Sequence, residues 1–433
     1  MRKKLLQLKN FNWRLWFALC SLALIPAVYQ TVRTFLISAG NQDEVFNIIG
    51  QMEWFDLINE TLHAFLIVPL YSVLNKIFKN QPGRFASAVF QTGLLVFVLY
   101  AVFSTGVFLH GKTLIRAMNA DGLNLSAVSR YLNLETAAFM IGIVASFIQV
   151  VFVVAEKHKN VYIFLAVRTA LSLIADFFLI PYGGVFGAAI SNILVNTVLA
   201  VIGCALLYAQ KNIRICRFKT TDFAILKAWC RTGTFSGFQQ FLDNLIYAVM
   251  ICKMVNLVEE QGNYWLANNF IWGWLLIPIT ALAEVIRSDC KNGYAELKRL
   301  SYCFISCACA VFWALSIPLW KPFYRFAENL SNAEEIFSIT IKLVPFYIAY
   351  AGSSIIDNIF IGLGKTAYNM LNSLLVNLVY YGVFYGLYLT QAIVFDMDTI
   401  ILMFGFGMVF HFAISLAEEK VFQKRGMRFL DRH

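Results

Sequence analysis

Long apolar runs, separated by short polar connections, extend along the whole chain. A helix that crosses a membrane needs about 20 predominantly apolar residues, and the pattern contains twelve stretches of this kind. We expect these helices at residues 13–39, 45–75, 85–110, 124–155, 160–180, 185–209, 225–258, 264–290, 297–320, 336–363, 368–390 and 397–418. Because the connections are short, the pattern predicts an all-α polytopic membrane protein without a sizeable soluble domain.

Composition narrows the class of protein further. Of the 433 residues, 59% are hydrophobic and 14% are charged, whereas soluble domains average about 45–50% and about 25%. These fractions exclude a soluble globular enzyme, a disordered protein and a nucleic-acid-binding protein, and they make the lipid bilayer a partner of the chain. The net charge of +10 does not change this, because the basic residues occur in short blocks between the apolar runs.

The basic residues also predict the orientation in the membrane. If the N-terminus is cytoplasmic, the connections on that side hold 26 Lys and Arg residues and those on the other side hold 5. Cytoplasmic loops of membrane proteins carry an excess of Lys and Arg. We therefore expect both termini in the cytoplasm and the protein in the plasma (inner) membrane.

The two halves of the sequence show a faint internal repeat. A shift of 210 residues aligns residues 24–33 with residues 234–243, and a shift of 209 aligns the loop ending at Asn160 with the loop ending at Asn369. Six helices followed by six more in the same orientation predict two lobes with a substrate path near the midplane. The predicted lobes span residues 1–209 and 232–433, and the basic segment 210–231 is the predicted cytoplasmic linker.

Four short motifs follow one another along the chain. They are Asp176-Phe-Phe-Leu-Ile180, Gly184-x-x-Gly-Ala-Ala189, the Gln-containing stretch Gly233–Asp243, and Asp357–Thr366 with its Gly-x-Gly-Lys-Thr end. In order, spacing and topology they resemble the multidrug and toxin extrusion (MATE) family, within the multidrug/oligosaccharidyl-lipid/polysaccharide (MOP) flippase superfamily. The resemblance implies a V-shaped transporter of two six-helix lobes that alternates access and exports amphipathic, often cationic compounds in exchange for Na⁺ or H⁺. We expect a monomer with no cofactor besides the coupling ion.

Charged residues inside the apolar segments are candidates for function, because each costs about 2.5–3.5 kcal/mol to insert at the bilayer centre. Asp243 and Asp357 lie among amide and hydroxyl side chains. Such oxygens suit a hard metal cation, and burial favours proton uptake by a carboxylate. The resemblance also implies a cation site at these positions. We expect Asp243 and Asp357 to bind the coupling ion, as Na⁺ ligands or proton carriers, with Glu284 as a third member. Alternatively, each aspartate caps a helix break or bonds a neighbouring helix.

A substrate cavity is predicted around the first two helices. Many members of the family carry an aspartate on the first helix, where this chain has Arg33, and an arginine with a pKa above about 12 accepts no proton. Asp56 and Glu60 stand four residues apart on one helix face, and we expect them to pair with Arg33 in the cavity wall. The alternative is a structural ion pair away from the substrate. The other predicted cavity residues are Tyr29, Gln239 and Gln240.

The leading functional prediction is a secondary active transporter that exports small amphipathic or cationic compounds. A flippase or exporter for a lipid-linked or anionic precursor is the alternative, and Arg33 supports it. An intramembrane enzyme is the least favoured class, because the five histidines form no His-Glu-x-x-His or His-x-x-x-Asp pattern. The sequence is compatible with Na⁺ or H⁺ coupling, with several substrate classes and with either direction of transport.

Overall fold

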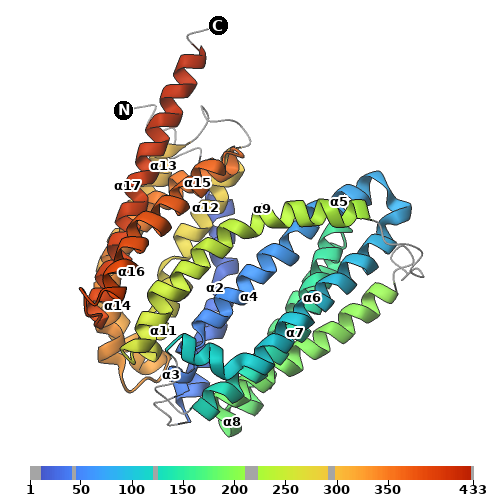
Figure 1. Cartoon of the computed structure of the whole chain (residues 1–433), viewed down its shortest axis with the longest axis horizontal. Helices are drawn as coiled ribbons and strands as arrows, with labels where there is room; N and C mark the ends of the chain where they lie inside the picture. The colour runs from blue at the N-terminus through green and yellow to red at the C-terminus, as the bar shows by residue number, and fades with distance from the viewer. Residues whose placement is uncertain (1–10, 41–44, 120–124, 210–222, 291–297, 431–433) are drawn as a thin grey trace. The chain divides into compact units, whose positions relative to one another are not determined.

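The structure is a computed structural model, and all of the elements that it describes are helices (Figure 1). It describes residues 11–40, 45–119, 125–209, 223–290 and 298–430, without the side chains of residues 235, 236 and 425–430. Each of the twelve predicted segments coincides with helical residues, which confirms the all-α fold class. The chain forms two compact units, unit 1 (Met1–Phe35 with Glu260–His433) and unit 2 (Leu36–Glu259).

Most of the helices are suited to a membrane. Within the described ranges, nine are long and apolar enough to cross it, or ten if the bent pair Gln261–Leu275 and Ile277–Asp289 is one span. One of the nine, His158–Tyr208, contains two predicted segments. The chain is therefore an integral membrane protein, and the predicted count of twelve spans is consistent with these helices.

Unit 2 contains a helical segment that is broken at a proline. α4 (Glu53–Leu66) ends just before α5 (Val68–Asn80), whose first turn contains Pro69. Proline is tolerated there because the first N–H groups of a helix have no helical partner. The other elements of unit 2 are α3 (Val45–Gly50), α6 (Pro82–Ala117), α7 (Leu125–Val154), α8 (His158–Tyr208), α9 (Phe223–Tyr247), η2 (Ala248–Cys252) and α10 (Lys253–Leu257).

α8 consists of two helices joined at a glycine. Gly184 has φ 54° and ψ −131°, which lie outside the helical region, and glycine adopts such angles without a Cβ clash. At Gly187 the backbone is also crowded, since a Cβ there would lie 2.2 Å from the carbonyl oxygen of Leu179. The break falls between the predicted segments 160–180 and 185–209, as the sequence predicts.

Apolar side chains of α5, α6, α7 and α8 form the core of unit 2, and α7 packs between α6 and α8 (Figure 1). α9 packs on α4 and α5 at two glycines. A Cβ at Gly237 would lie 2.4 Å from the Phe65 ring, and one at Gly233 would lie 2.6 Å from the Phe65 carbonyl oxygen. The indole N–H of Trp229 donates to the Leu66 carbonyl at 3.0 Å. The Gly-x-x-x-Gly spacing therefore lets the backbones of α9 and α4 approach closely.

Unit 1 is arranged around α14 (Ala333–Gly362), which packs against helices on several sides. Its neighbours include α17 (Met397–Leu430), whose early residues are buried against it. The remaining elements are α2 (Trp13–Ser38), α11 (Gln261–Phe270), η3 (Ile271–Leu275), α12 (Ile277–Asp289), α13 (Arg299–Pro322), η6 (Phe323–Ala327), α15 (Ala367–Leu374), η7 (Leu375–Tyr381) and α16 (Gly382–Leu389).

The first helix, α2, is tied into unit 1 by two indole groups. Trp16 donates its indole N–H to the Pro278 carbonyl at 3.0 Å, and Trp274 donates to the Thr31 hydroxyl at 3.1 Å. Unit 1 thus combines most of α2 with residues 260–433, and unit 2 includes α9. The predicted lobes 1–209 and 232–433 stay a prediction, and residues 210–222 of the predicted linker lie outside the described residues.

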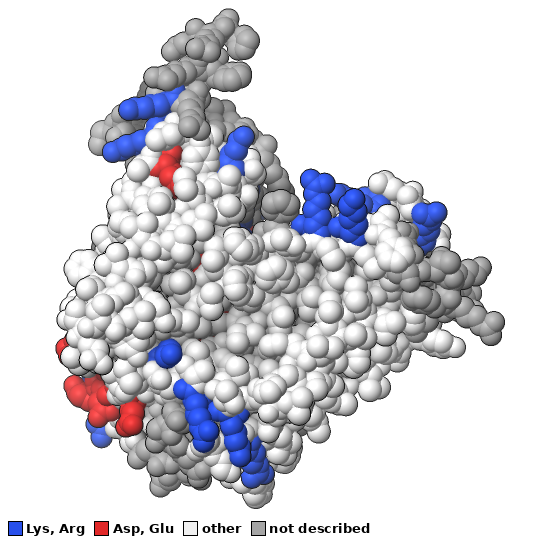
Figure 2. Space-filling model, viewed as in Figure 1, with Lys and Arg blue, Asp and Glu red and all other residues white. Residues whose placement is uncertain are grey.

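Acidic side chains gather at the end of unit 1 where α14 and α17 begin (Figure 2). Glu334 forms an ion pair with Lys321 there, and Lys342 contacts Asp398 at 2.5 Å. These acids lie in connections that the sequence assigns to the outer side of the membrane. The exposed acids at this end are Glu334, Glu335, Asp396 and Asp398.

Candidate functional site

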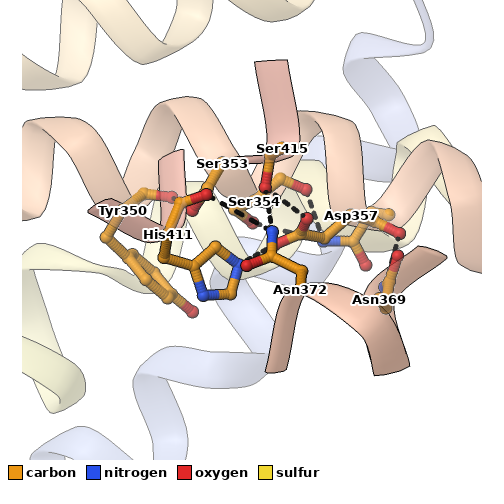
Figure 3. Close-up of polar contacts among 9 residues, drawn as sticks. Tyr350, Ser353, Ser354, Asp357, Asn369, Asn372, His411 and Ser415 are labelled. Carbon is orange, nitrogen blue, oxygen red and sulfur yellow. Dashed lines mark hydrogen bonds and ion pairs between the residues drawn. The ribbon is translucent and has the colours of Figure 1, made fainter. Parts of the chain in front are cut away.

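A polar cluster in unit 1 surrounds the predicted site residue Asp357 (Figure 3). We call it the Asp357 cluster, and it draws side chains from α14, α15 and α17. These helices contact one another, and all three belong to candidate membrane spans. The members of the Asp357 cluster are Asp357, Asn369, Asn372, His411 and Ser415.

A polar stripe on α14 leads to Asp357. The Ser353 hydroxyl donates to the Tyr350 carbonyl at 3.0 Å, and the Asn358 amide donates to the Ser354 carbonyl at 2.7 Å. Short polar side chains often satisfy themselves on the preceding helical turn in this way. The serines and Asn358 are buried, and these bonds satisfy the side-chain donors of Ser353 and Asn358 beside Asp357.

Both carboxylate oxygens of Asp357 are bonded by α17. Nε2 of His411 lies 2.9 Å from Oδ2, and the Ser415 hydroxyl donates to Oδ1 at 3.0 Å. His411 and Ser415 are four residues apart, so they share one face of α17. The side chains of Asp357 and His411 are 20% and 34% exposed, so the pair is partly open.

Two asparagines of α15 complete the Asp357 cluster. The Asn372 amide donates to the Ser415 hydroxyl at 2.7 Å and to the His411 carbonyl at 3.3 Å. The Asn369 amide donates to the Asp357 backbone carbonyl at 3.1 Å. Asn372 is fully buried, and among the described residues Oδ1 of each asparagine has no hydrogen-bond partner. The cluster therefore presents acceptor oxygens to which a cation or a proton can bind.

Glu284, the third predicted member of the cation site, is paired with an arginine. Its carboxylate lies 2.6 Å from Nη1 of Arg287, and the two side chains are 52% and 39% exposed. Nε of Arg287 in turn donates to Oδ1 of Asn358 at 2.6 Å. Glu284 is thus linked to α14 through Arg287 and Asn358, and its role as a cation ligand stays a prediction.

Two of the predicted site residues of unit 2, Gln240 and Glu60, are bonded to Asn244 on α9. Asn244 accepts a hydrogen bond from Gln240 at 2.9 Å, and it donates to the Leu57 carbonyl at 2.9 Å and to Glu60 at 3.5 Å. Asp243 precedes it and is half-buried, as is Gln239. The structure therefore brings Gln240 and Glu60 together through an asparagine that sequence reasoning treated only as a neighbour.

Two predicted pairings involve residues of different units. Asp243 belongs to unit 2 and Asp357 to unit 1, so a site shared by both carboxylates stays a prediction. Arg33 lies in unit 1, where Nη1 is 3.4 Å from the Tyr29 hydroxyl, whereas Asp56 and Glu60 lie on exposed positions of α4 in unit 2. The Arg33–Asp56/Glu60 network likewise stays a prediction.

Sequence reasoning gave no role to four members of the Asp357 cluster: Asn369, Asn372, His411 and Ser415. A signal for them exists in their spacing, because residues three or four apart face the same way on a helix. The described part of the chain contains no group of three or more His, Cys, Asp or Glu residues that could hold a metal ion. A cation at the Asp357 cluster would therefore be held by one carboxylate with hydroxyl and amide oxygens.

Solved structures of membrane transporters share this fold. An inward-facing multidrug resistance MATE family transporter of the MOP superfamily matches with a TM-score of 0.72 at 15% identity, over 92% of this chain and 95% of that chain. An outward-facing multidrug resistance MATE family transporter matches with a TM-score of 0.65 at 15% identity, over 99% and 98% of the two chains. The chain therefore has the fold of MATE family transporters, which confirms the resemblance at the level of the fold.

A third similar structure differs in its described function. It is a MOP superfamily transporter from Pyrococcus furiosus, and it matches with a TM-score of 0.66 at 15% identity, over 97% of both chains. The reversed polarity of its binding pocket is described as suggesting a different function. No family model matches the sequence of this chain, and no curated protein matches it significantly.

Proposed function

We propose that the chain is a secondary active transporter that exports small amphipathic or cationic compounds across the plasma membrane, coupled to influx of Na⁺ or H⁺. The observation that carries the proposal is the Asp357 cluster, in which a carboxylate on α14 is bonded by two side chains of α17 within the membrane-spanning region. Ionisable residues inside membrane spans mark ion or proton paths by default. The similarity to MATE family transporter structures supports a transport function.

The coupling step follows from the position of Asp357. When a cation neutralises the carboxylate, the charge at the α14–α17 contact changes while His411 and Ser415 hold the oxygens in place. α14 also packs against α11, α12 and α13, so its position affects much of unit 1. A ligand shifts a conformational equilibrium only as far as it binds one state better. Cation binding at Asp357 would favour one packing of α14, and cation release would favour the other.

Purified protein in liposomes tests this proposal. An inward Na⁺ or H⁺ gradient is imposed, and the movement of a fluorescent cationic dye is followed for the wild type, Asp357→Asn, Asp243→Asn and the exposed control Glu334→Gln. We expect Asp357→Asn to reduce movement to the rate of empty liposomes and the control to move dye as the wild type does. Loss in Asp243→Asn as well would support a joint site. Undiminished movement in Asp357→Asn would refute the role of the Asp357 cluster.

Arg33 favours a second candidate function, the transport of a lipid-linked or anionic precursor. Its guanidinium group is half-buried on α2 and bonded to Tyr29, and a guanidinium binds phosphate through several donors. The Pyrococcus furiosus transporter is likewise described as having a pocket of reversed polarity that suggests a different function. If this function holds, Arg33→Gln abolishes the movement of a fluorescent lipid with a diphosphate headgroup, and the cationic dye does not move in the wild type.

A further inference from the structure

Glu418 on α17 lies on the face of this helix that carries the Asp357 cluster. It follows Ser415 by three residues and His411 by seven, which is the spacing of one helix face. One turn further along α17, the ring of Phe422 lies 5.7 Å from the ring of Phe360 on α14. It also lies 5.9 Å from the ring of Tyr368, which precedes Asn369 on α15. Glu418 therefore lies between the Asp357 cluster and an aromatic contact of the same three segments.

The Glu418 carboxyl group is buried and has no partner in the described part of the chain. Glu418 is 8% exposed, and neither of its carboxyl oxygens has a hydrogen-bond donor there. The nearby Asn369 and Asn372 also each have a buried side-chain oxygen without a donor. This part of unit 1 therefore contains several buried acceptor oxygens to which no described residue donates a hydrogen bond.

The charged groups around Glu418 do not neutralise it. From α14, Asp357 acts on it as a like charge, and this effect exceeds the opposite effect of His411, which lies on α17 itself and is bonded to Asp357. Arg299 of α13 pairs with Glu419 at 2.5 Å. On α12, Arg287 pairs with Glu284, and on α15 the ring of Tyr368 contacts that of Phe422. Leaving one carboxylate buried without a counter-charge or a donor is strongly destabilising.

We propose that Glu418 binds a proton of the transport cycle, as a second proton-binding residue beside Asp357. The proton converts the carboxylate to a carboxylic acid, which removes the buried charge and supplies an O–H donor for the buried acceptor oxygens nearby. The proton is released to water when the packing of α17 on α14 and α15 opens. The role of Glu418 in transport rests on the proposed function, whereas proton binding by Glu418 can be tested independently of it.

Infrared spectroscopy on the purified full chain decides whether Glu418 is protonated. A protonated carboxyl group has a carbonyl stretch that a carboxylate lacks, and wild type is compared with Glu418→Gln and Glu418→Asp. We expect the wild type to show this band and Glu418→Gln to lose it, because glutamine has nearly the shape of glutamate but no carboxyl group. Glu418→Asp, which keeps a carboxyl group, should retain the band. Identical protonated-carboxyl bands in wild type and Glu418→Gln would overturn the proposal.

Carbodiimide labelling gives a residue-resolved measure. Dicyclohexylcarbodiimide is apolar and adds to protonated carboxyl groups, and mass spectrometry locates the adduct. The matched internal control is the next residue, Glu419, which forms an ion pair with Arg299. We expect label on Glu418 and not on Glu419, falling about tenfold for each pH unit above the midpoint. Equal, pH-independent label on both residues would contradict the proposal.

Transport in liposomes then separates this inference from the proposed function. We expect Glu418→Gln to lose movement driven by a proton gradient, with Glu334→Gln again as the control. If Glu418→Gln follows the proton gradient as well as the wild type does, the transport role of Glu418 is refuted. If the wild type moves no test compound under any gradient, the proposed function fails, whereas the infrared band still decides proton binding at Glu418.

Discussion

Glu328 is a buried carboxyl group outside the membrane-spanning helices, in the connection between η6 and α14. It is 5% exposed, and burial raises its pKa to about 8. Between the ordinary glutamate pKa of about 4.3 and this value, the folded chain binds a proton that the unfolded chain has released. Stability therefore falls as the pH rises through this window, by about 5 kcal/mol in all, and it is unaffected by Glu328 at lower pH.

The fall in stability with rising pH gives a prediction for Glu328→Gln, a variant that cannot ionise at this position. We expect the thermal midpoint of the wild type in detergent to fall, relative to that of the variant, as the pH rises from about 6 to about 9. The variant should be the more stable protein at the alkaline end. Glu156→Gln, at an exposed position after α7, is the control and should track the wild type. Parallel profiles for wild type and Glu328→Gln would show that Glu328 does not titrate in this range.

The bond between Asn372 and Ser415 should couple α15 to α17 energetically. Asn372 is fully buried, and its amide donates to the Ser415 hydroxyl at 2.7 Å. Removing one partner leaves a buried polar group unsatisfied, at a cost of about 1–3 kcal/mol. In thermal unfolding we expect Asn372→Ala and Ser415→Ala each to destabilise the protein by this order, and the double variant by less than the sum. Strict additivity would mean that the two side chains do not interact.

At the residue scale, sequence reasoning found Asp357 and missed most of the residues that bond it. A carboxylate in an apolar segment is costly to insert and is therefore conspicuous in the sequence. Asn369, Asn372 and Ser415 are neutral, and similar residues occur in many helices without a shared role. Their association depends on how α15 and α17 pack on α14, which the one-dimensional pattern does not specify.

At the scale of elements, the break in α8 depends on one glycine. Gly184 has a positive φ of 54°, where a side chain is strained, whereas its neighbour Gly183 is half-buried and has open space around its Cβ position. We expect Gly184→Ala to lower stability by about 1–3 kcal/mol in thermal unfolding. Gly183→Ala, the matched control, should be neutral or stabilise by up to about 1 kcal/mol. An equal effect of both substitutions would show that the left-handed conformation is not required.

The elements were largely predictable because a membrane span has a strong apolar signal. The predicted boundary at residues 181–184 matches the break at Gly184. The π-helical turns were not predicted: η2, η3, η6 and η7 interrupt α-helices without a change in hydropathy. The membership of the compact units was not predicted either, since the sequence repeat groups helices by order along the chain, whereas packing places most of α2 with residues 260–433.

At the scale of the whole molecule, the distribution of charge predicts which ends of the helices face the cytoplasm. Acidic side chains gather where α14 and α17 begin (Figure 2), and Ala392 is exposed in the connection before α17. Gly83 is exposed at the start of α6, in a connection with Lys76, Lys79 and Arg84. The positive-inside rule then places Gly83 in the cytoplasm and Ala392 outside.

Cysteine labelling in intact cells tests both this sidedness and the number of spans. The variants Gly83→Cys and Ala392→Cys are treated with a membrane-impermeant maleimide, and label above that of the native cysteines is measured. We expect Ala392→Cys to label in intact cells and Gly83→Cys only after permeabilisation. The predicted segments place nine spans, an odd number, between the two positions. If Gly83→Cys labels in intact cells and Ala392→Cys only after permeabilisation, the orientation is the inverse of the predicted one. If both positions label from the same side, an even number of spans separates the two positions, which refutes the prediction of twelve spans.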